Sequence, residues 1–205
     1  MSYRLEGDAT MQCPGLITTL IVVSALGMLG CTTTIRPPAN PENPVSVYVI
    51  DYGRHASLLL PRDDFHGLRE YAYGDWSWFA LARDGVLDVL PTLFLPTQGS
   101  LGRWDWDIEA DIEHIERLVL CEEILEIRVA RNDARALLAE LDSRYESHLD
   151  TQIESDLYQL LFVHDDEPYY VFNSCNLVLI RWLKSLDCKI EGYPILADFR
   201  IAEPH

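Results

Sequence analysis

The chain has 205 residues, of which 48% are hydrophobic and 24% charged, a composition typical of a folded globular protein. Its formal net charge is −17, with acids spread along the chain, which argues against nucleic acid and against a bare anionic lipid surface as partners. The five cysteines form no C-x-x-C pair and no other metal-ligand spacing. We therefore predict no metal site and no cofactor.

An uncharged apolar run at residues 15–30 ends at Cys31. Its last residues, M-L-G-C, resemble the lipobox at which bacterial lipoprotein precursors are cleaved and acylated on the cysteine. The run is shorter than the about 20 residues that a membrane-spanning helix needs. We therefore interpret residues 1–30 as a lipoprotein-type signal segment and Cys31 as the lipidation site. An uncleaved anchor and a buried helix are the alternatives.

Residues 31–44 contain four prolines and several small polar residues, a composition typical of a tether. We expect the folded domain to cover residues 45–205. If Cys31 is acylated, the lipid holds this domain at a membrane in the cell envelope, on the periplasmic side.

Two strands are predicted at the start of the domain. Residues 45–50 are a continuous run of β-forming residues, and residues 55–60 follow after a glycine turn, so the two are expected to form a hairpin. The period of two in the second strand places His55 and Ser57 on one face and Leu58 on the other.

The rest of the domain alternates strands with helices. Residues 76–101 are apolar, aromatic and interrupted by Gly and Pro, which predicts short helices and turns. Asn132 is expected to cap an amphipathic helix with the apolar stripe Ala134, Leu137, Leu138, Leu141 and Tyr145. Further strands are predicted at residues 70–75, 104–107, 124–129, 158–163, 169–172 and 195–201.

A helix is predicted directly after the strand at 169–172, because the apolar residues from Leu177 onward follow helical spacing. Asn173 and Ser174 are both N-cap residue types, which places Cys175 in the first turn. Free N–H groups and the helix dipole favour a thiolate there, so Cys175 is a candidate nucleophile.

Core packing is the alternative role for this cysteine. Helical steps from Cys175 lead to Leu179, Trp182 and Leu186, so its side chain is expected on the apolar face of the helix, and cysteine is among the most buried residue types. A partner histidine would favour catalysis over packing.

Three motifs occur in order along the chain: G-R-H-A-S-L-L-L-P at 53–61, Y-G-D at 73–75 and F-N-S-C-N at 172–176. Together they resemble a bacterial family of predicted lipoproteins of unknown function, with the hallmarks G-W-H-T-G-L-V-L-P, G-W-G-D and N-x-C-N-T-W. The resemblance extends over residues 45–186. That family in turn is similar to circularly permuted papain-like hydrolases of the NlpC type, in which the histidine strand precedes the cysteine helix.

The resemblance implies an α+β, permuted papain-like (NlpC-type) domain, with an antiparallel sheet packed against a helix that carries the cysteine at its N-terminus. It makes Cys175 the nucleophile and His55 its base. The implied group that orients the imidazole is Asp75, with Ser57, Asp63 and Asp64 as alternatives. Backbone N–H groups at the helix start, around Ser174 and Asn176, would bind the oxyanion.

The expected function is therefore that of a lipid-anchored thiol hydrolase. It would cleave an amide, peptide or ester bond of an envelope small molecule or peptide through the Cys175–His55 pair. A catalytically inactive lipoprotein that acts as a binding or structural module is the first alternative. A cysteine-dependent acyltransferase is the second, because permuted relatives transfer acyl groups through the same cysteine.

Overall fold

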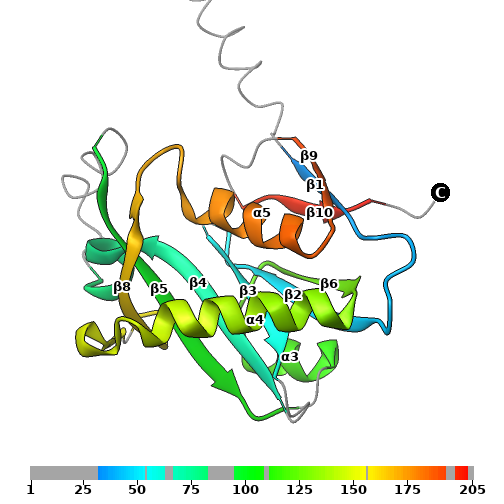
Figure 1. Cartoon of the computed structure of the whole chain (residues 1–205), viewed down its shortest axis with the longest axis horizontal. Coiled ribbons are helices and arrows are strands. Elements are labelled where there is room, and N and C mark those ends of the chain that lie inside the picture. Colours follow the sequence, from blue (N-terminus) through cyan, green and yellow to red (C-terminus); the bar gives the residue numbers. More distant parts are fainter. Residues whose placement is uncertain are drawn as a thin grey trace, which may run out of the picture. The chain divides into compact units, whose positions relative to one another are not determined.

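The computed structural model describes residues 32–53, 55–62, 67–82, 95–108, 111–155, 157–192 and 197–202. The predicted signal segment, Cys31, and the alternatives Asp63 and Asp64 lie outside these residues. Within the described part the chain combines helices with mostly antiparallel sheet (Figure 1). The predicted α+β class is confirmed.

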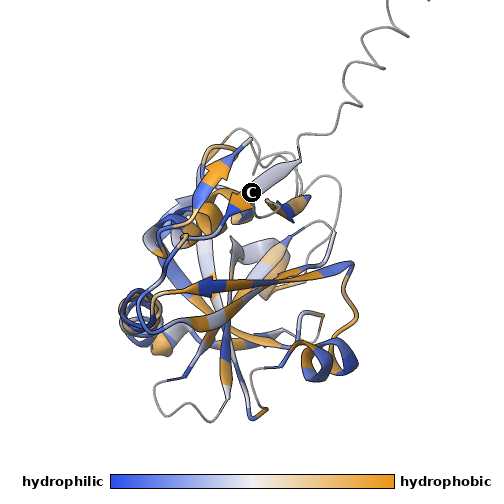
Figure 2. Cartoon of the chain, turned by 90° about the vertical axis from the view of Figure 1, so that its right-hand side faces the viewer, coloured by the Kyte–Doolittle hydropathy of each residue, from blue (hydrophilic) through white to orange (hydrophobic). Residues whose placement is uncertain are grey.

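Within the described part, the larger sheet has seven strands in the order β6-β2-β3-β4-β5-β8-β7, and all neighbours are antiparallel. Its strands are β2 (Val45–Asp51), β3 (Ala56–Pro61), β4 (Leu68–Asp75), β5 (Thr97–Trp106), β6 (Glu123–Val129), β7 (Ile153–Ser155) and β8 (Leu160–Tyr169). The predicted β2–β3 hairpin is confirmed by pairs such as Tyr48 with Leu59. Ribbon colours in Figure 2 change between hydrophobic and hydrophilic along several strands, as expected for a period of two.

Two strand predictions need correction. Of the strand predicted at residues 169–172, only Tyr169 lies in a strand, as the last residue of β8, and residues 170–173 form a tight turn in which the Asn173 N–H donates to the Tyr170 carbonyl at 2.8 Å. The strand predicted at residues 158–163 instead continues without interruption from Leu160 to Tyr169. Pairing with β5, for example Ser100 with His164, extends the strand through the polar residues 164–168.

The second sheet described by the structure joins the two ends of the folded body. It consists of β1 (Thr33–Arg36), β9 (Lys189–Glu191) and β10 (Phe199–Ile201), with β1 in the middle. The predicted tether at 31–44 is therefore partly structured. The side chain of Ile35 is fully buried in the main core, and this burial explains why β-branched residues next to the proline-rich stretch form a strand.

The described helical segments are η1 (a π-helical turn, Trp76–Ala80), α3 (Ile112–Leu118), α4 (Arg131–Glu146), η2 (a 3₁₀ turn, Leu149–Thr151) and α5 (Cys175–Ser185). The N-cap of α4 is Ala130, not Asn132 as predicted, but the five residues of the predicted apolar stripe are all buried. Helix α3 was not predicted, although Asp111 caps it by accepting a hydrogen bond from the Glu113 N–H.

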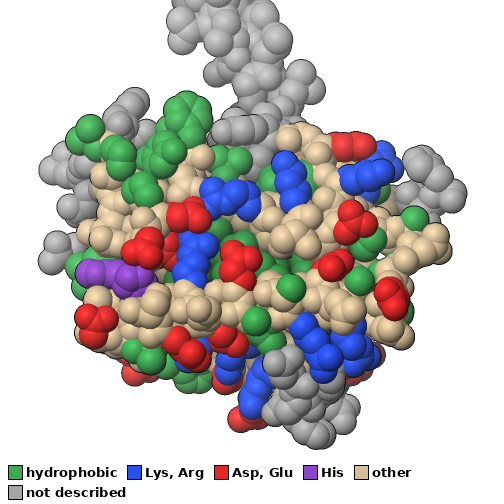
Figure 3. All heavy atoms as spheres, viewed as in Figure 1, with side chains coloured by type: hydrophobic (Ala, Val, Ile, Leu, Met, Phe, Trp, Pro, Cys, Tyr) green, Lys and Arg blue, Asp and Glu red, His purple; other side chains and the backbone are tan. Residues whose placement is uncertain are grey.

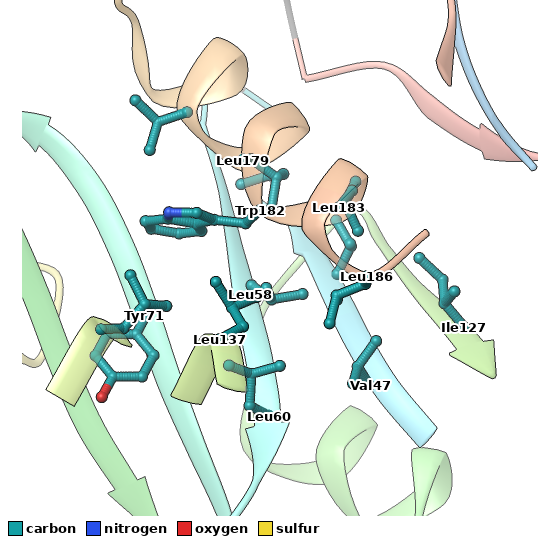
Figure 4. Close-up of a cluster of buried hydrophobic side chains, with 14 of the residues drawn as sticks. Val47, Leu58, Leu60, Tyr71, Ile127, Leu137, Leu179, Trp182, Leu183 and Leu186 are labelled. Carbon is teal, nitrogen blue, oxygen red and sulfur yellow. The ribbon is translucent and has the colours of Figure 1, made fainter. Parts of the chain in front are cut away.

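Helices α4 and α5 cover one face of the larger sheet, which we call the helix-covered face. Figure 4 shows Leu179, Trp182 and Leu183 of α5 pointing toward the sheet, where Leu58 and Leu60 belong to the same buried cluster. Burial of one such aliphatic side chain contributes about 1.5–3 kcal/mol. This core fixes the position of α5, and therefore of Cys175 at its start.

Ion pairs join α4 to strands β4, β5 and β8 of the larger sheet. Asp142 of α4 accepts hydrogen bonds from Arg69 at 2.6 Å and from Arg103 at 3.1 Å. Arg144 donates two hydrogen bonds of 2.8 Å to Asp165 of β8. Basic and acidic side chains are interspersed on the side viewed in Figure 3, so the net negative charge is not concentrated there.

The other face of the sheet, which we call the cavity face, has two smaller apolar clusters. One contains Tyr48, Leu59 and Ile115, and the other contains Phe79 and Phe162. The predicted alternation along β3 is confirmed, because Leu58 lies in the helix-covered core and Leu59 in a cluster of the cavity face.

Candidate functional site

Cys175 is the first residue of α5 and directly follows the N-cap, Ser174. The predicted position in the first helical turn is therefore confirmed. Hydrogen bonds from the backbone N–H groups of Cys175 and Asn176, and from the Tyr169 hydroxyl, reach the thiol. The Sγ atom also lies 3.8 Å from Oδ1 of Asn176. The helix start thus supplies the donors that a thiolate or an oxyanion would need.

Burial nevertheless dominates the ionisation of this thiol. The side chain is only 7% exposed, and burial raises the pKa of Cys175 to about 11 despite the three hydrogen bonds that lower it. Near pH 7 the group is therefore a thiol, not the thiolate expected from the helix terminus alone. Ionisation requires a base that accepts the proton as the sulfur reacts.

A network around Asn173 fixes the turn that leads into α5. Its Nδ2 donates to the Pro168 carbonyl at 2.7 Å and to the Tyr73 hydroxyl at 3.1 Å. Its Oδ1 accepts a hydrogen bond of 2.7 Å from Arg181, which also pairs with Glu167. The turn is therefore tied to β4, β8 and the middle of α5, so the start of the helix is held rigidly.

His55 lies immediately before β3, where aromatic rings surround it. Tyr52 stacks on the imidazole with ring centroids 4.7 Å apart, and Phe79 and Tyr158 make edge contacts at 5.3 and 5.1 Å. Burial lowers the pKa of His55 to about 4. The imidazole is therefore neutral near pH 7, which is the form that can accept a proton.

The structure brings His55 and Cys175 to the same cavity, whose volume is about 950 Å³. Because His55 and Ser57 belong to the cavity face and Cys175 to α5, this cavity extends from the cavity face to the start of the helix. Among the described residues, no hydrogen bond joins the imidazole to the thiol. The aromatic part of the lining comprises Tyr52, Trp78, Phe79, Trp104, Trp106, Tyr158 and Tyr169.

Asp75 makes different contacts from those that the resemblance implied. Its carboxylate accepts a hydrogen bond of 2.9 Å from the Trp78 N–H, which caps η1, and one of 2.5 Å from the Thr97 hydroxyl. None of its hydrogen bonds within the described chain reaches His55. Asp75 thus fixes the start of η1, whose residue Phe79 in turn contacts the imidazole.

Glu70 is the site residue that the sequence analysis did not identify. Its side chain is 2% exposed, yet it lines the cavity. Oε1 accepts hydrogen bonds from Ser57 at 2.5 Å and from Tyr52 at 3.0 Å, and Oε2 accepts one from the Trp106 indole N–H at 3.0 Å. Ser57, an alternative partner for His55 in the sequence analysis, donates its proton to Glu70 instead.

A signal for Glu70 was present in the sequence. It shares the predicted strand 70–75 with Ala72 and Gly74, and the period of two places all three on one face. A glutamate among such small residues on a strand face indicates either an exposed edge or a buried polar site. The hydrogen-bond donors to Glu70 decide between these possibilities, and they come from other segments of the chain, namely Tyr52, Ser57 and Trp106.

The described residues contain neither a metal-binding cluster nor a membrane-spanning helix. No group of three or more His, Cys, Asp or Glu side chains in this part of the chain is arranged to hold a metal ion. No helix within the same residues is long and apolar enough to cross a membrane.

Comparisons with family models, curated proteins and solved structures found no match for this chain. The resemblance described above therefore has only the three motifs as its support, and function must be argued from the cavity itself.

Proposed function

We propose that the protein is a thiol hydrolase with a permuted papain-like (NlpC-type) arrangement, in which Cys175 is the nucleophile and His55 the base. The observation that supports this most directly is that both side chains line one cavity. The order of the elements agrees with the proposal, because the histidine strand precedes a helix that begins at the cysteine and packs on an antiparallel sheet. The substrate would be an amide, peptide or ester of the cell envelope.

In the proposed reaction the thiol proton passes to a ring nitrogen of His55 while Sγ bonds to the substrate carbonyl carbon. Backbone N–H groups at the start of α5 stabilise the oxyanion. The imidazolium returns the proton to the leaving amine or alcohol as the C–N or C–O bond breaks. Water then hydrolyses the thioester, which gives a carboxylic acid and restores the thiol.

The ionisation states of the pair define what the proposed reaction requires. A thiol with a pKa of about 11 and a neutral imidazole with a pKa of about 4 form an uncharged pair near pH 7. Proton transfer must then accompany attack on the substrate, as in general-base catalysis. Binding of a substrate that displaces water from the cavity would not have to break an existing ion pair.

A binding module without catalysis is the second candidate. The burial of Cys175 and its high pKa favour this role, because a thiol that never ionises is inert. A cavity of about 950 Å³ with aromatic walls can bind a small molecule whether or not the thiol reacts.

Alkylation by iodoacetamide near pH 7 separates the two candidates. The hydrolase proposal predicts that Cys175 is modified and that His55→Ala slows its modification by roughly tenfold or more, as expected for loss of a general base. Cys188 is buried and does not line the cavity, so it serves as the internal control for unfolding. If Cys175 reacts no faster than Cys188, or reacts as fast in His55→Ala as in the natural chain, the result favours a binding module without catalysis.

We further propose that the protein is anchored by a lipid on Cys31 to a bacterial membrane, on its periplasmic side. Strand β1 begins at Thr33, so the proposed lipid is attached immediately before the folded body. Cys31→Ser is expected to move the protein from the membrane to the soluble fraction, with Cys121→Ser as the control. Unchanged fractionation of Cys31→Ser would refute the lipid anchor.

A further inference from the structure

Two buried acids of the described chain, Asp165 and Glu70, differ in the charge of their partners. The side chain of Asp165 has no exposed surface and is paired with Arg144 by two hydrogen bonds. Glu70 is equally buried, but its hydrogen bonds come from two hydroxyls and an indole, which are all neutral. Glu70 therefore lacks a compensating positive charge among the described residues.

The cavity that Glu70 faces offers no cation either. The charged side chains among its described lining residues are Glu70 and Glu122, and no Lys or Arg belongs to that lining. His55, the remaining titratable base of the lining, has a pKa of about 4 because it is buried. The described lining of the cavity thus offers acidic and neutral groups but no cation near pH 7.

Aromatic rings stand beside this carboxyl group. Trp104 is the direct cross-strand neighbour of Glu70, and the indole of Trp106 donates to it. The rings of Trp78 and Tyr158 belong to the same lining. A desolvated cation is attracted both to a carboxylate and to the faces of aromatic rings. Among these rings, indole makes the strongest cation–π interaction.

We propose that the part of the cavity around Glu70 binds an organic cation of the ammonium class, with Glu70 as its counter-ion and Trp104 as a ring wall. That this cation is part of the substrate rests on the proposed hydrolase function. The substrate class then becomes an amide or ester that carries an ammonium group beside the bond that Cys175 attacks. The binding of the cation itself does not require the thiol to react.

The hydrogen bonds of Glu70 suit this role. Burial raises its pKa, whereas the hydrogen bonds from Ser57, Trp106 and Tyr52 lower it. A cation in the cavity favours the ionised carboxylate further, because an opposite charge within a few ångströms lowers the pKa of an acid. The three donors also hold the carboxyl group in place, so little side-chain freedom is lost on binding.

The test uses the full-length chain with Cys175→Ser, so that no turnover can occur. Two probes of nearly the same shape are compared, choline and its uncharged isostere 3,3-dimethylbutan-1-ol, by calorimetry and by tryptophan fluorescence. Choline is expected to bind at least about tenfold more tightly than the alcohol, since a counter-ion and a ring wall together contribute more than about 1.4 kcal/mol. In Glu70→Gln this preference should disappear.

Glu70→Gln places an amide N–H₂ among three donors and can disturb the fold, so a second variant is needed. Trp104 is 40% exposed, and Trp104→Leu should leave the melting temperature nearly unchanged while it weakens choline binding by about fivefold. Glu140→Gln is the matched control, because Glu140 is exposed on α4 and its loss should not affect binding.

The outcomes decide the inference separately from the hydrolase proposal. Equal binding of the two probes, no binding of choline at millimolar concentration, or equal losses in Glu70→Gln and Glu140→Gln would each overturn it. Preferential binding of choline by a protein whose Cys175 proves inert would support it, and would make the cavity a cation-binding site without catalysis.

Discussion

Two buried acids on opposite faces of the larger sheet have different partners. On the helix-covered face, Arg144 neutralises Asp165, and Arg69 and Arg103 pair with the half-buried Asp142. On the cavity face, Glu70 is as deeply buried as Asp165 but accepts hydrogen bonds only from neutral groups within the described chain. The two acids therefore differ in whether a cation of the described chain compensates their negative charge.

A carboxylate that already has an arginine partner has little capacity left for a ligand. Pairs of this kind hold α4 against β8 and so stabilise the body of the protein. A carboxyl group held by neutral donors has no cation of its own among the described residues, so a cation that enters the cavity can become its partner. The comparison therefore assigns a structural role to Asp165 and a ligand-binding role to Glu70, and it can be tested by removing partners on each face.

The largest effect on stability is expected from Arg144→Ala. This change leaves the Asp165 carboxylate buried without its cation, which costs about 3–5 kcal/mol of the free energy of unfolding. Urea denaturation near pH 7 measures it. Arg117→Ala is the control, because Arg117 pairs with Glu113 on an exposed surface and its loss should cost less than about 1 kcal/mol. Equal losses in the two variants would remove the distinction between structural and surface pairs.

A smaller effect, of opposite sign, is expected from Asp51→Asn. Asp51 is 4% exposed, and burial together with the nearby Glu122 and Glu123 raises its pKa from 3.8 to about 6. The folded state therefore holds a proton that the unfolded state has lost between about pH 4 and pH 6, so the free energy of unfolding decreases as pH rises through this window. Asparagine does not titrate, so the variant should not lose this part of the free energy of unfolding as pH rises. Its side-chain oxygen can still accept the hydrogen bond from the Gly53 N–H.

Asp51→Asn should therefore be about 1–2 kcal/mol more stable than the natural chain near pH 7, and close to it near pH 4. Urea denaturation at the two pH values measures the difference. Glu154→Gln is the control for a change of net charge, since Glu154 is exposed on β7. If Asp51→Asn loses stability with rising pH as steeply as the natural chain, Asp51 is not the group responsible.

Features that depend on neighbouring residues were predictable from the sequence. The helix that begins at Cys175, the β2–β3 hairpin and the apolar stripe of α4 all follow from local periodicity and were predicted correctly. The alternation along β3 also placed His55 and Ser57 on the same face. These patterns encode the elements that carry the candidate site.

Features that depend on distant partners were not predictable. Strand β8 continues through a polar stretch because β5 pairs with it and Arg144 neutralises Asp165. The prediction of a thiolate at Cys175 considered the helix terminus but not the burial, which has the larger effect on its pKa. The buried environment of Glu70 likewise arises from donors on other strands.

The central claim is that His55 acts as a base toward Cys175, and the pH dependence of Cys175 alkylation tests it most directly. If the claim holds, the rate of modification rises as His55 loses its proton near pH 4 and stays nearly constant up to about pH 9. Throughout this range the rate in His55→Ala is lower than in the natural chain. A rate that instead climbs about tenfold per pH unit toward the thiol pKa of about 11, and is the same in His55→Ala, would show an isolated buried thiol and contradict the account.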